Sequence, residues 1–140
     1  MMDPTTPPAG RPDPIVTADA AFFWEGAKRG QLLALRCLGC GELQHPPRPM
    51  CPRCHSVQQE PTPLSGRGKV SSWIMPRHPP PVGFARPPVV VLVELEEGIR
   101  LVSNLVDTVD GHVALGMEVE VRFEPTVGGF AVPVFRPRNG

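Results

Sequence analysis

Two Cys-x-x-Cys pairs constrain the fold of this chain more than any other feature. They read Cys37-Leu38-Gly39-Cys40 and Cys51-Pro52-Arg53-Cys54, and ten residues separate them. Two residues between thiolates let one tight turn direct both sulfurs at the same ion, and two such turns complete a tetrahedron. Four thiolates leave no coordination position for a substrate water, so the pattern predicts structural rather than catalytic zinc. The predicted ligands are Cys37, Cys40, Cys51 and Cys54.

Three other chemistries use similar cysteine patterns, and each lacks support elsewhere in the sequence. Disulfides are rare in the reducing cytoplasm, where we expect this chain. A redox Cys-x-x-Cys normally stands alone at a helix start in a βαβ unit, which is not predicted here. The run from Cys51 to His55 matches the c-type haem pattern, but haem attachment follows export and the first ten residues do not resemble a signal peptide. We therefore interpret His55 as a neighbour of the second cysteine turn.

Composition favours a mostly β fold with little helix. The 140 residues include 20 prolines and 14 glycines, which disfavour long helices and favour many turns. Basic and acidic side chains balance at 14 each, so the chain lacks the positive field that nucleic-acid-binding proteins use. No stretch is long and apolar enough for a membrane span. These features predict a cytoplasmic protein.

The pattern divides the chain into a tail, a zinc module and a barrel. Residues 1–16 contain five prolines and are predicted to be a flexible tail. Residues 17–62 are predicted to hold one short helix, which Thr17 can cap, then a strand over 31–36 and the two cysteine turns. We expect residues 60–63 to act as a linker and residues 63–140 to form the barrel.

Five strand candidates follow, separated by turn signals. They cover residues 68–75, 89–93, 99–106, 117–124 and 130–135. The fourth is the clearest, because apolar residues alternate with charged ones from Met117 to Glu124. Pro133 in the fifth strand indicates an edge or a bulge. Five short strands with this interruption fit a partly open Greek-key barrel, the OB fold.

Aromatic side chains supply candidate contact surfaces. Phe22, Phe23 and Trp24 are adjacent, so they cannot all lie on one side of a short helix. They either fill a groove between the zinc module and the barrel or anchor a partner protein, and the two roles are compatible. Trp73 lies in the first barrel strand on the same face as Met75, and we expect Trp73 in the core.

The sequence does not predict a catalytic constellation. The four histidines, His45, His55, His78 and His112, fall in predicted turns, where a lone histidine is more often solvent-exposed than catalytic. The run Gly66-Arg67-Gly68 lacks the helix and the further spaced glycine of a phosphate-binding loop. We therefore expect that the chain is not an enzyme by itself.

The order of these features resembles the zinc-ribbon OB-fold family of acyl-CoA-associated proteins, a group once catalogued as a domain of unknown function. The resemblance covers nearly everything from about residue 18 to residue 137. It rests on five runs in one order, residues 22–26, 33–41, 45–54, 65–70 and 133–137. It implies an N-terminal helix and a rubredoxin-like zinc ribbon packed on a C-terminal five-stranded OB-fold barrel.

The resemblance also implies a role. Family members are usually encoded beside thiolase-superfamily enzymes, including the lipid-transfer-protein-like aldolases of bacterial steroid side-chain degradation. We therefore expect a non-catalytic accessory subunit that stabilises a thiolase-like acyltransferase or retro-aldolase acting on acyl-CoA, bound to a dimeric partner. A glycine often follows the last cysteine in the family, whereas this chain has His55. If CoA contacts the chain, its phosphates would pair with basic residues near the barrel entrance, Arg67, Lys69, Arg77 and Arg86.

Two other functions stay open at this point. Zinc ribbons and OB folds bind nucleic acid in other proteins, so a nucleic-acid-binding module is the alternative, although the balanced charge argues against it. A free-standing CoA-ester hydrolase would need a nucleophile or a base that the sequence does not reveal.

Overall fold

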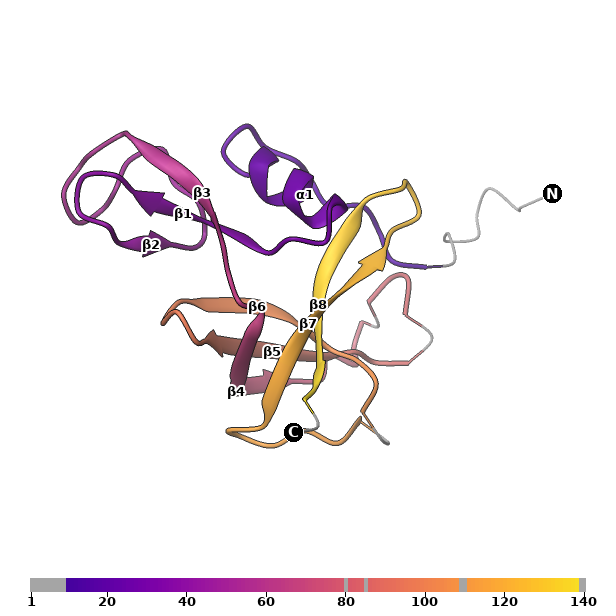
Figure 1. Ribbon diagram of the computed structural model, residues 1–140. Helices are drawn as coiled ribbons and strands as arrows, with labels where there is room; N and C mark the ends of the chain where they lie inside the picture. The colour runs from indigo at the N-terminus through magenta and orange to yellow at the C-terminus, as the bar shows by residue number, and fades with distance from the viewer. Residues whose placement is uncertain (1–9, 80, 85, 109–110, 139–140) are drawn as a thin grey trace.

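A short helix and two β-structures make up the described part of the chain (Figure 1). The computed structural model describes residues 10–79, 81–84, 86–108 and 111–138. The first nine residues of the expected tail lie outside these ranges. Within them, the single helix is too short to cross a membrane.

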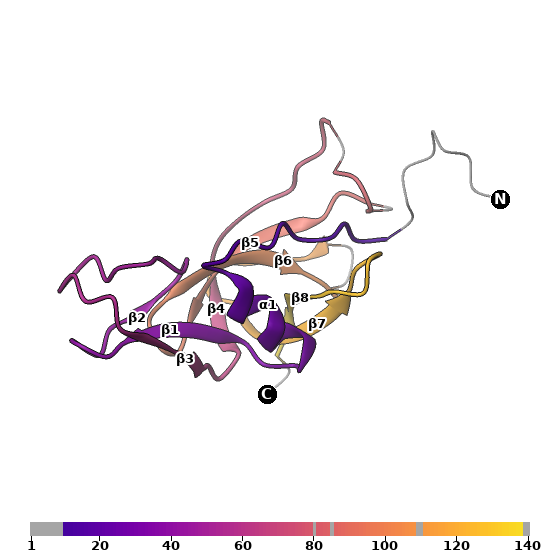
Figure 2. The same cartoon turned by 90° about the horizontal axis from the view of Figure 1, so that it is seen from above.

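The helix α1 covers Ala21–Lys28 and packs against both the zinc ribbon, residues 33–63, which from here on we call the zinc module, and the barrel (Figures 1 and 2). Its N-cap is Ala20, so the cap expected at Thr17 is wrong; the carbonyl of Thr17 instead accepts a hydrogen bond from Ala20 N in the preceding turn. Gly26 faces the zinc module, where a Cβ would lie 2.5 Å from Cδ1 of Leu33. A glycine at this position therefore lets the helix approach the module closely.

Three short strands support the cysteine turns, in the sheet order β2-β1-β3. They are β1 Leu33–Cys37, β2 Leu43–Gln44 and β3 Gln59–Pro63. The expected linker is wrong, because residues 60–63 belong to β3, which pairs with β1 along its whole length. Because β3 is an edge strand, the nitrogens of Pro61 and Pro63 can face away from β1. Their missing N–H groups then remove no hydrogen bond from the sheet. The pairing extends past β3, because Leu64 N donates to Leu32 O at 2.9 Å.

Five further strands close into a barrel in the order β4-β5-β6-β8-β7. They are β4 Arg67–Ile74, β5 Val89–Leu95, β6 Arg100–Leu105, β7 Glu118–Pro125 and β8 Ala131–Pro137. All five predicted strands are present with slightly shifted ends, and the barrel expected to be partly open is closed by pairing of β4 with β7. The closure is thinnest between β6 and β8, whose ladder contains the single parallel pair Leu105–Phe135. Pro133 lies outside that pair, in a part of β8 whose ladder runs to β7 only. At Pro133, β8 is therefore an edge strand, as predicted.

One hydrophobic core joins the modules. The barrel interior contributes alternate residues of β5, together with Val119 and the fully buried Phe135. Phe23 of α1 and Leu32, just before β1, belong to the same cluster. The zinc module and the barrel therefore share one packed interior.

Trp73 is not in the core, contrary to the expectation. A β-bulge between Val70 and Ser72 shifts the alternation, so Trp73 pairs with the buried Val91 and lies on the same face of β4 as Val70. The strand runs past the packed interior at this end, which leaves Trp73 38% exposed and Ile74 63% exposed.

Residues 10–16, which we call the strap, follow the outside of the barrel (Figure 2). Asp13 Oδ1 accepts hydrogen bonds from Thr126 Oγ1 at 2.6 Å and Gly128 N at 2.8 Å. Val127 N donates to the carbonyl of Arg11 at 3.0 Å. These three bonds fasten the strap to the turn between β7 and β8.

Candidate metal centre and apolar groove

The four cysteines converge beside the β2-β1-β3 sheet. Their Sγ atoms all lie within 4.8 Å of one another, with 3.4 Å between Cys37 and Cys54 and 3.7 Å between Cys40 and Cys51. Sulfurs that each lie about 2.3 Å from one zinc ion at tetrahedral angles are about 3.8 Å apart. The donor set and its spacing therefore fit zinc, and the structure brings all four predicted ligands together.

The two cysteine turns have the same backbone geometry. In each, the residue after the second cysteine donates its N–H to the carbonyl of the first, at 2.8 Å for Gly41 and 2.9 Å for His55. Gly41 has φ of 80° and His55 has φ of 65°, so both adopt the left-handed conformation. Gly39, inside the first turn, does not have a positive φ. His55 thus takes the conformation of the glycine it replaces, and the second turn keeps its geometry.

The first cysteine of each pair is the more acidic one, because backbone amides lower its pKa, whereas burial and hydrogen bonds with other thiols raise the pKa of Cys40 and Cys54. The N–H of Cys40 is the main cause that lowers the pKa of Cys37 to about 6, and the N–H of Cys54 likewise lowers the pKa of Cys51. The N–H of Ser56 also lowers the pKa of Cys54, but hydrogen bonding with Cys37 and burial outweigh it and raise that pKa to about 12. Metal uptake at neutral pH must therefore displace protons from the second cysteines, which makes it pH-dependent.

His55 offers a direct test of the second turn. Replacing it by glycine should raise the free energy of unfolding of the zinc-loaded chain by about 1 kcal/mol, because glycine adopts a positive φ without strain. Urea titration followed by circular dichroism measures the change.

Gly41→Ala is the matched variant in the first turn. A Cβ there has no neighbour within 4 Å in the described part of the chain, so its effect is conformational and should destabilise the chain by a similar amount. Loss of stability in His55→Gly would instead mean that the imidazole makes a stabilising contact.

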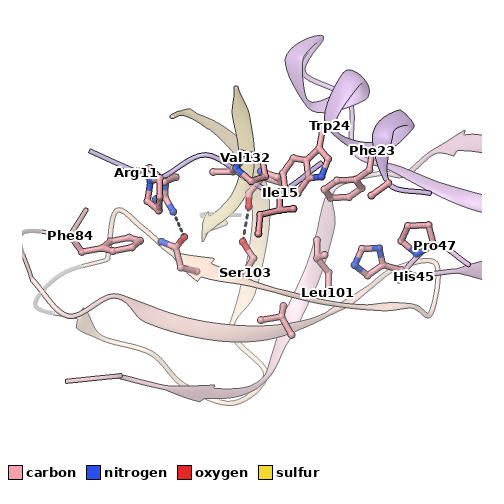
Figure 3. Close-up of a pocket in the computed structure, with 16 residues that line it drawn as sticks. Arg11, Ile15, Phe23, Trp24, His45, Pro47, Phe84, Leu101, Ser103 and Val132 are labelled. Atoms are coloured by element: carbon pink, nitrogen blue, oxygen red, sulfur yellow. Dashed lines mark hydrogen bonds between the residues drawn. The ribbon is translucent and has the colours of Figure 1, made fainter. Parts of the chain in front are cut away.

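An apolar groove of 540 Å³ opens between the strap, α1 and strands β6 and β8 (Figure 3). Phe23 forms its α1 side, packing edge to face on Trp24 at 4.9 Å and against the ring of His45 at 5.6 Å. His45 was expected in an exposed turn but is half-buried here, and burial lowers its pKa. Its imidazole is therefore neutral at neutral pH.

The aromatic run of α1 is largely occupied by internal packing. Phe23 is buried in the core, while Phe22 and Trp24 are half-buried and pack against the same cluster. The three residues thus fill the space between the zinc module and the barrel. Their role in docking a partner stays a prediction.

The four predicted CoA-binding residues lie in two places. Arg67 and Lys69 are on β4 in an acidic setting, where Glu96 pairs with Arg67 at 3.4 Å. Arg77 and Arg86 belong to the loop beyond the other end of β4. Because a strand rises roughly 3.3 Å per residue, the two ends of β4 lie roughly 20 Å apart, and the two pairs are associated with opposite ends.

Sequence reasoning missed Arg11, which lines the groove. It was assigned to the tail because its neighbours are prolines and glycine. A single arginine in such a segment carries no signal of its own, and its position depends on contacts with distant residues of the barrel.

Comparisons with known proteins agree with this architecture. Residues 24–57 match the family model for the ChsH2 rubredoxin-like zinc ribbon domain, and residues 61–124 match the one for the ChsH2 C-terminal OB-fold domain. A probable enoyl-CoA hydratase alpha subunit of Thermomonospora curvata is 43% identical over 131 residues, which are 94% of this chain and 41% of the relative. The chain thus spans less than half the length of that relative.

Two further similarities concern proteins of comparable size. Benzoylsuccinyl-CoA thiolase subunit BbsA of Geobacter metallireducens is 35% identical over 94 residues, which are 67% of this chain and 62% of that subunit. A chain of the solved Ltp2-ChsH2(DUF35) aldolase superposes with a TM-score of 0.84 at 42% identity, covering 89% of this chain and 98% of that one. These matches confirm the resemblance in the sequence: the chain belongs to the ChsH2-type DUF35 family of zinc-ribbon and OB-fold proteins.

Proposed function

We propose that this chain is a non-catalytic accessory subunit that binds and stabilises a thiolase-superfamily enzyme acting on an acyl-CoA. The observation that carries the proposal is the structural similarity between this chain and a chain of the solved Ltp2-ChsH2(DUF35) aldolase. The similarity covers 98% of the aldolase chain. The similarity to a subunit of benzoylsuccinyl-CoA thiolase supports a partner of the thiolase superfamily. In this proposal the partner supplies the catalytic residues, and a steroid side-chain thioester is one candidate substrate.

Zinc has a structural role in this proposal. Cys37 and Cys51 are buried, and a fourth thiolate would complete the coordination sphere, so the ion would not bind substrate. Its contribution is to hold the ribbon folded beside the barrel.

We place the partner contact at the ribbon tip, which we define as Leu38, Met50 and Val57. These apolar side chains flank the cysteines in the sequence and are 55%, 47% and 71% exposed. Leu38 N donates to Gln58 O at 2.9 Å, so the segments that carry Leu38 and Val57 are adjacent, and exposed apolar side chains on neighbouring segments occur at protein interfaces. Phe23 is buried and cannot contact a partner directly. Of the three aromatic residues predicted to dock a partner, the half-buried Phe22 and Trp24 therefore remain candidates.

If CoA contacts the chain, Arg77 and Arg86 are better candidates for binding its phosphates than Arg67 and Lys69 on β4. Both are exposed, and neither takes part in an ion pair among the described residues. Arg67 and Lys69 instead lie beside three glutamates, whose negative charge repels a phosphate: Glu94, Glu96 and Glu118.

Co-expression tests the accessory role. The chain and a co-expressed thiolase-superfamily partner from the same organism should elute from a size-exclusion column as one species at micromolar concentration, and activity should require both. Two separate peaks would contradict the proposal.

Leu38→Glu examines the ribbon tip, because a charge in an apolar interface is costly. It should weaken the complex roughly tenfold or more while leaving zinc content unchanged. Leu115→Glu is the matched control, since Leu115 is 67% exposed in a loop outside the ribbon. Equal loss of binding in both variants would place the interface elsewhere.

A further inference from the structure

The apolar groove has a charged end and a neutral end. Arg11 lies at one end beside Phe84, and His45 lies at the other beside Phe23 (Figure 3). Between them the walls are formed by apolar side chains such as Ile15, Leu101 and Val132. Since the imidazole of His45 is neutral, Arg11 supplies the positive charge among these residues.

Arg11 is held in place by several independent contacts. Its Nη1 donates to Asn104 Oδ1 of β6 at 2.8 Å, and its guanidinium lies 5.1 Å from the centre of the Phe84 ring. Its carbonyl accepts from Val127 N. The side chain is held by the barrel and the β4–β5 loop, and the backbone is bonded to the β7–β8 turn, so the position of Arg11 does not depend on a bound molecule.

The charge of Arg11 is incompletely compensated. Burial lowers the pKa of Arg11, against the opposing effect of Glu124. Glu124 is itself paired with Arg122, and Asp13 is engaged with Thr126 and Gly128. Within the described ranges, Arg11 belongs to none of the ion pairs. Among the described residues, the half-buried guanidinium makes one side-chain hydrogen bond, to Asn104, and borders an apolar space, which favours an anion there.

We propose that this groove binds a small amphipathic anion, whose apolar body lies along the groove and whose carboxylate or phosphate pairs with Arg11. Its volume of 540 Å³ falls within the range of small-molecule sites, which are mostly apolar with a few fixed polar groups. The site is separate from the ribbon tip and needs no partner subunit. It therefore goes beyond the accessory role, and either proposal can fail without the other.

Trp24 provides a local reporter of binding. The chain has two tryptophans, and Trp73 lies on β4, outside the groove. In a Trp73→Phe background, the fluorescence of Trp24 should change saturably when dodecanoate or dodecyl phosphate is added below its micelle concentration. The two anions distinguish a carboxylate ligand from a phosphate ligand. Dodecyltrimethylammonium, with the same chain and the opposite charge, should bind roughly tenfold more weakly or worse.

Two variants in that background separate the charge from the apolar walls. Arg11→Gln should weaken both anions roughly tenfold or more and leave the cation unchanged, whereas Arg138→Gln, at an exposed arginine beside β4, should have no effect. Val132→Phe narrows the groove and should weaken all three probes. Circular dichroism and thermal melting verify that each variant is folded.

Three results would overturn the proposal. The first is the absence of saturable binding of both anions. The second is equal affinity for the cation and the anions, and the third is unchanged anion affinity in Arg11→Gln. Any one of these results would contradict the binding of an amphipathic anion at Arg11 in this groove.

Discussion

Cys51→Ser is expected to abolish stoichiometric zinc binding and to unfold the ribbon, residues 33–63. Cys51 is 0% exposed, so the substitution leaves a weaker ligand and an unpaired hydroxyl inside the module. Structural zinc sites contribute on the order of 10–16 kcal/mol of binding free energy, which exceeds what three short strands can supply by themselves. The barrel should also lose stability, because Phe23 and Leu32 belong to its core.

Zinc content of the purified protein, measured colorimetrically after denaturation, tests this expectation. The unaltered chain should contain about one zinc per molecule, and Cys51→Ser should contain close to none. Met50→Ser is the matched control, because it introduces serine at the adjacent position, where the native side chain is 47% exposed. A Cys51→Ser protein with full zinc content and an unchanged circular dichroism spectrum would refute the four-thiolate site.

Phe135→Ala is expected to have the second largest effect, a loss of about 3–5 kcal/mol in the free energy of unfolding. The ring is 0% exposed, and Phe135 forms the single ladder pair that joins β8 to β6. Its carbonyl also accepts from Val106 N at 2.8 Å. The cavity would therefore open at the thinnest part of the barrel wall, where few other contacts hold the strands together.

Urea titration of the zinc-loaded chain measures the loss. Phe130→Ala is the control, because that ring is half-buried near the β7–β8 turn, where Lys28 lies 4.7 Å from its centre, and its removal should cost about 1 kcal/mol or less. Equal losses in the two variants would mean that Phe135 has no special part in closing the barrel.

The sequence identified the features that depend on local chemistry. The spacing of the cysteines defines a metal site without reference to the rest of the fold, because each pair is a self-contained turn. The barrel strands were recognisable because turn residues bound them, and β7 most clearly because one of its faces is polar.

Features that depend on distant partners could not be predicted. Pro61 and Pro63 indicated a linker, since only the register with β1 reveals that β3 is an edge strand. Trp73 is exposed because β4 runs past the packed interior, and the sequence of the strand does not mark where that interior ends. The position of Arg11 follows from bonds to residues more than ninety positions away.

The pairing of β3 also affects how the molecule binds other molecules. Only residues 64–66 separate β3 from β4, and all three are tied down: Leu64 by Leu32, Ser65 by Glu97 at 2.7 Å, and the carbonyl of Gly66 by Val121 N at 2.7 Å. A connection so short and so fully bonded lacks the freedom of a hinge. A surface that spans both modules is therefore preorganised, and association loses little conformational entropy in this chain.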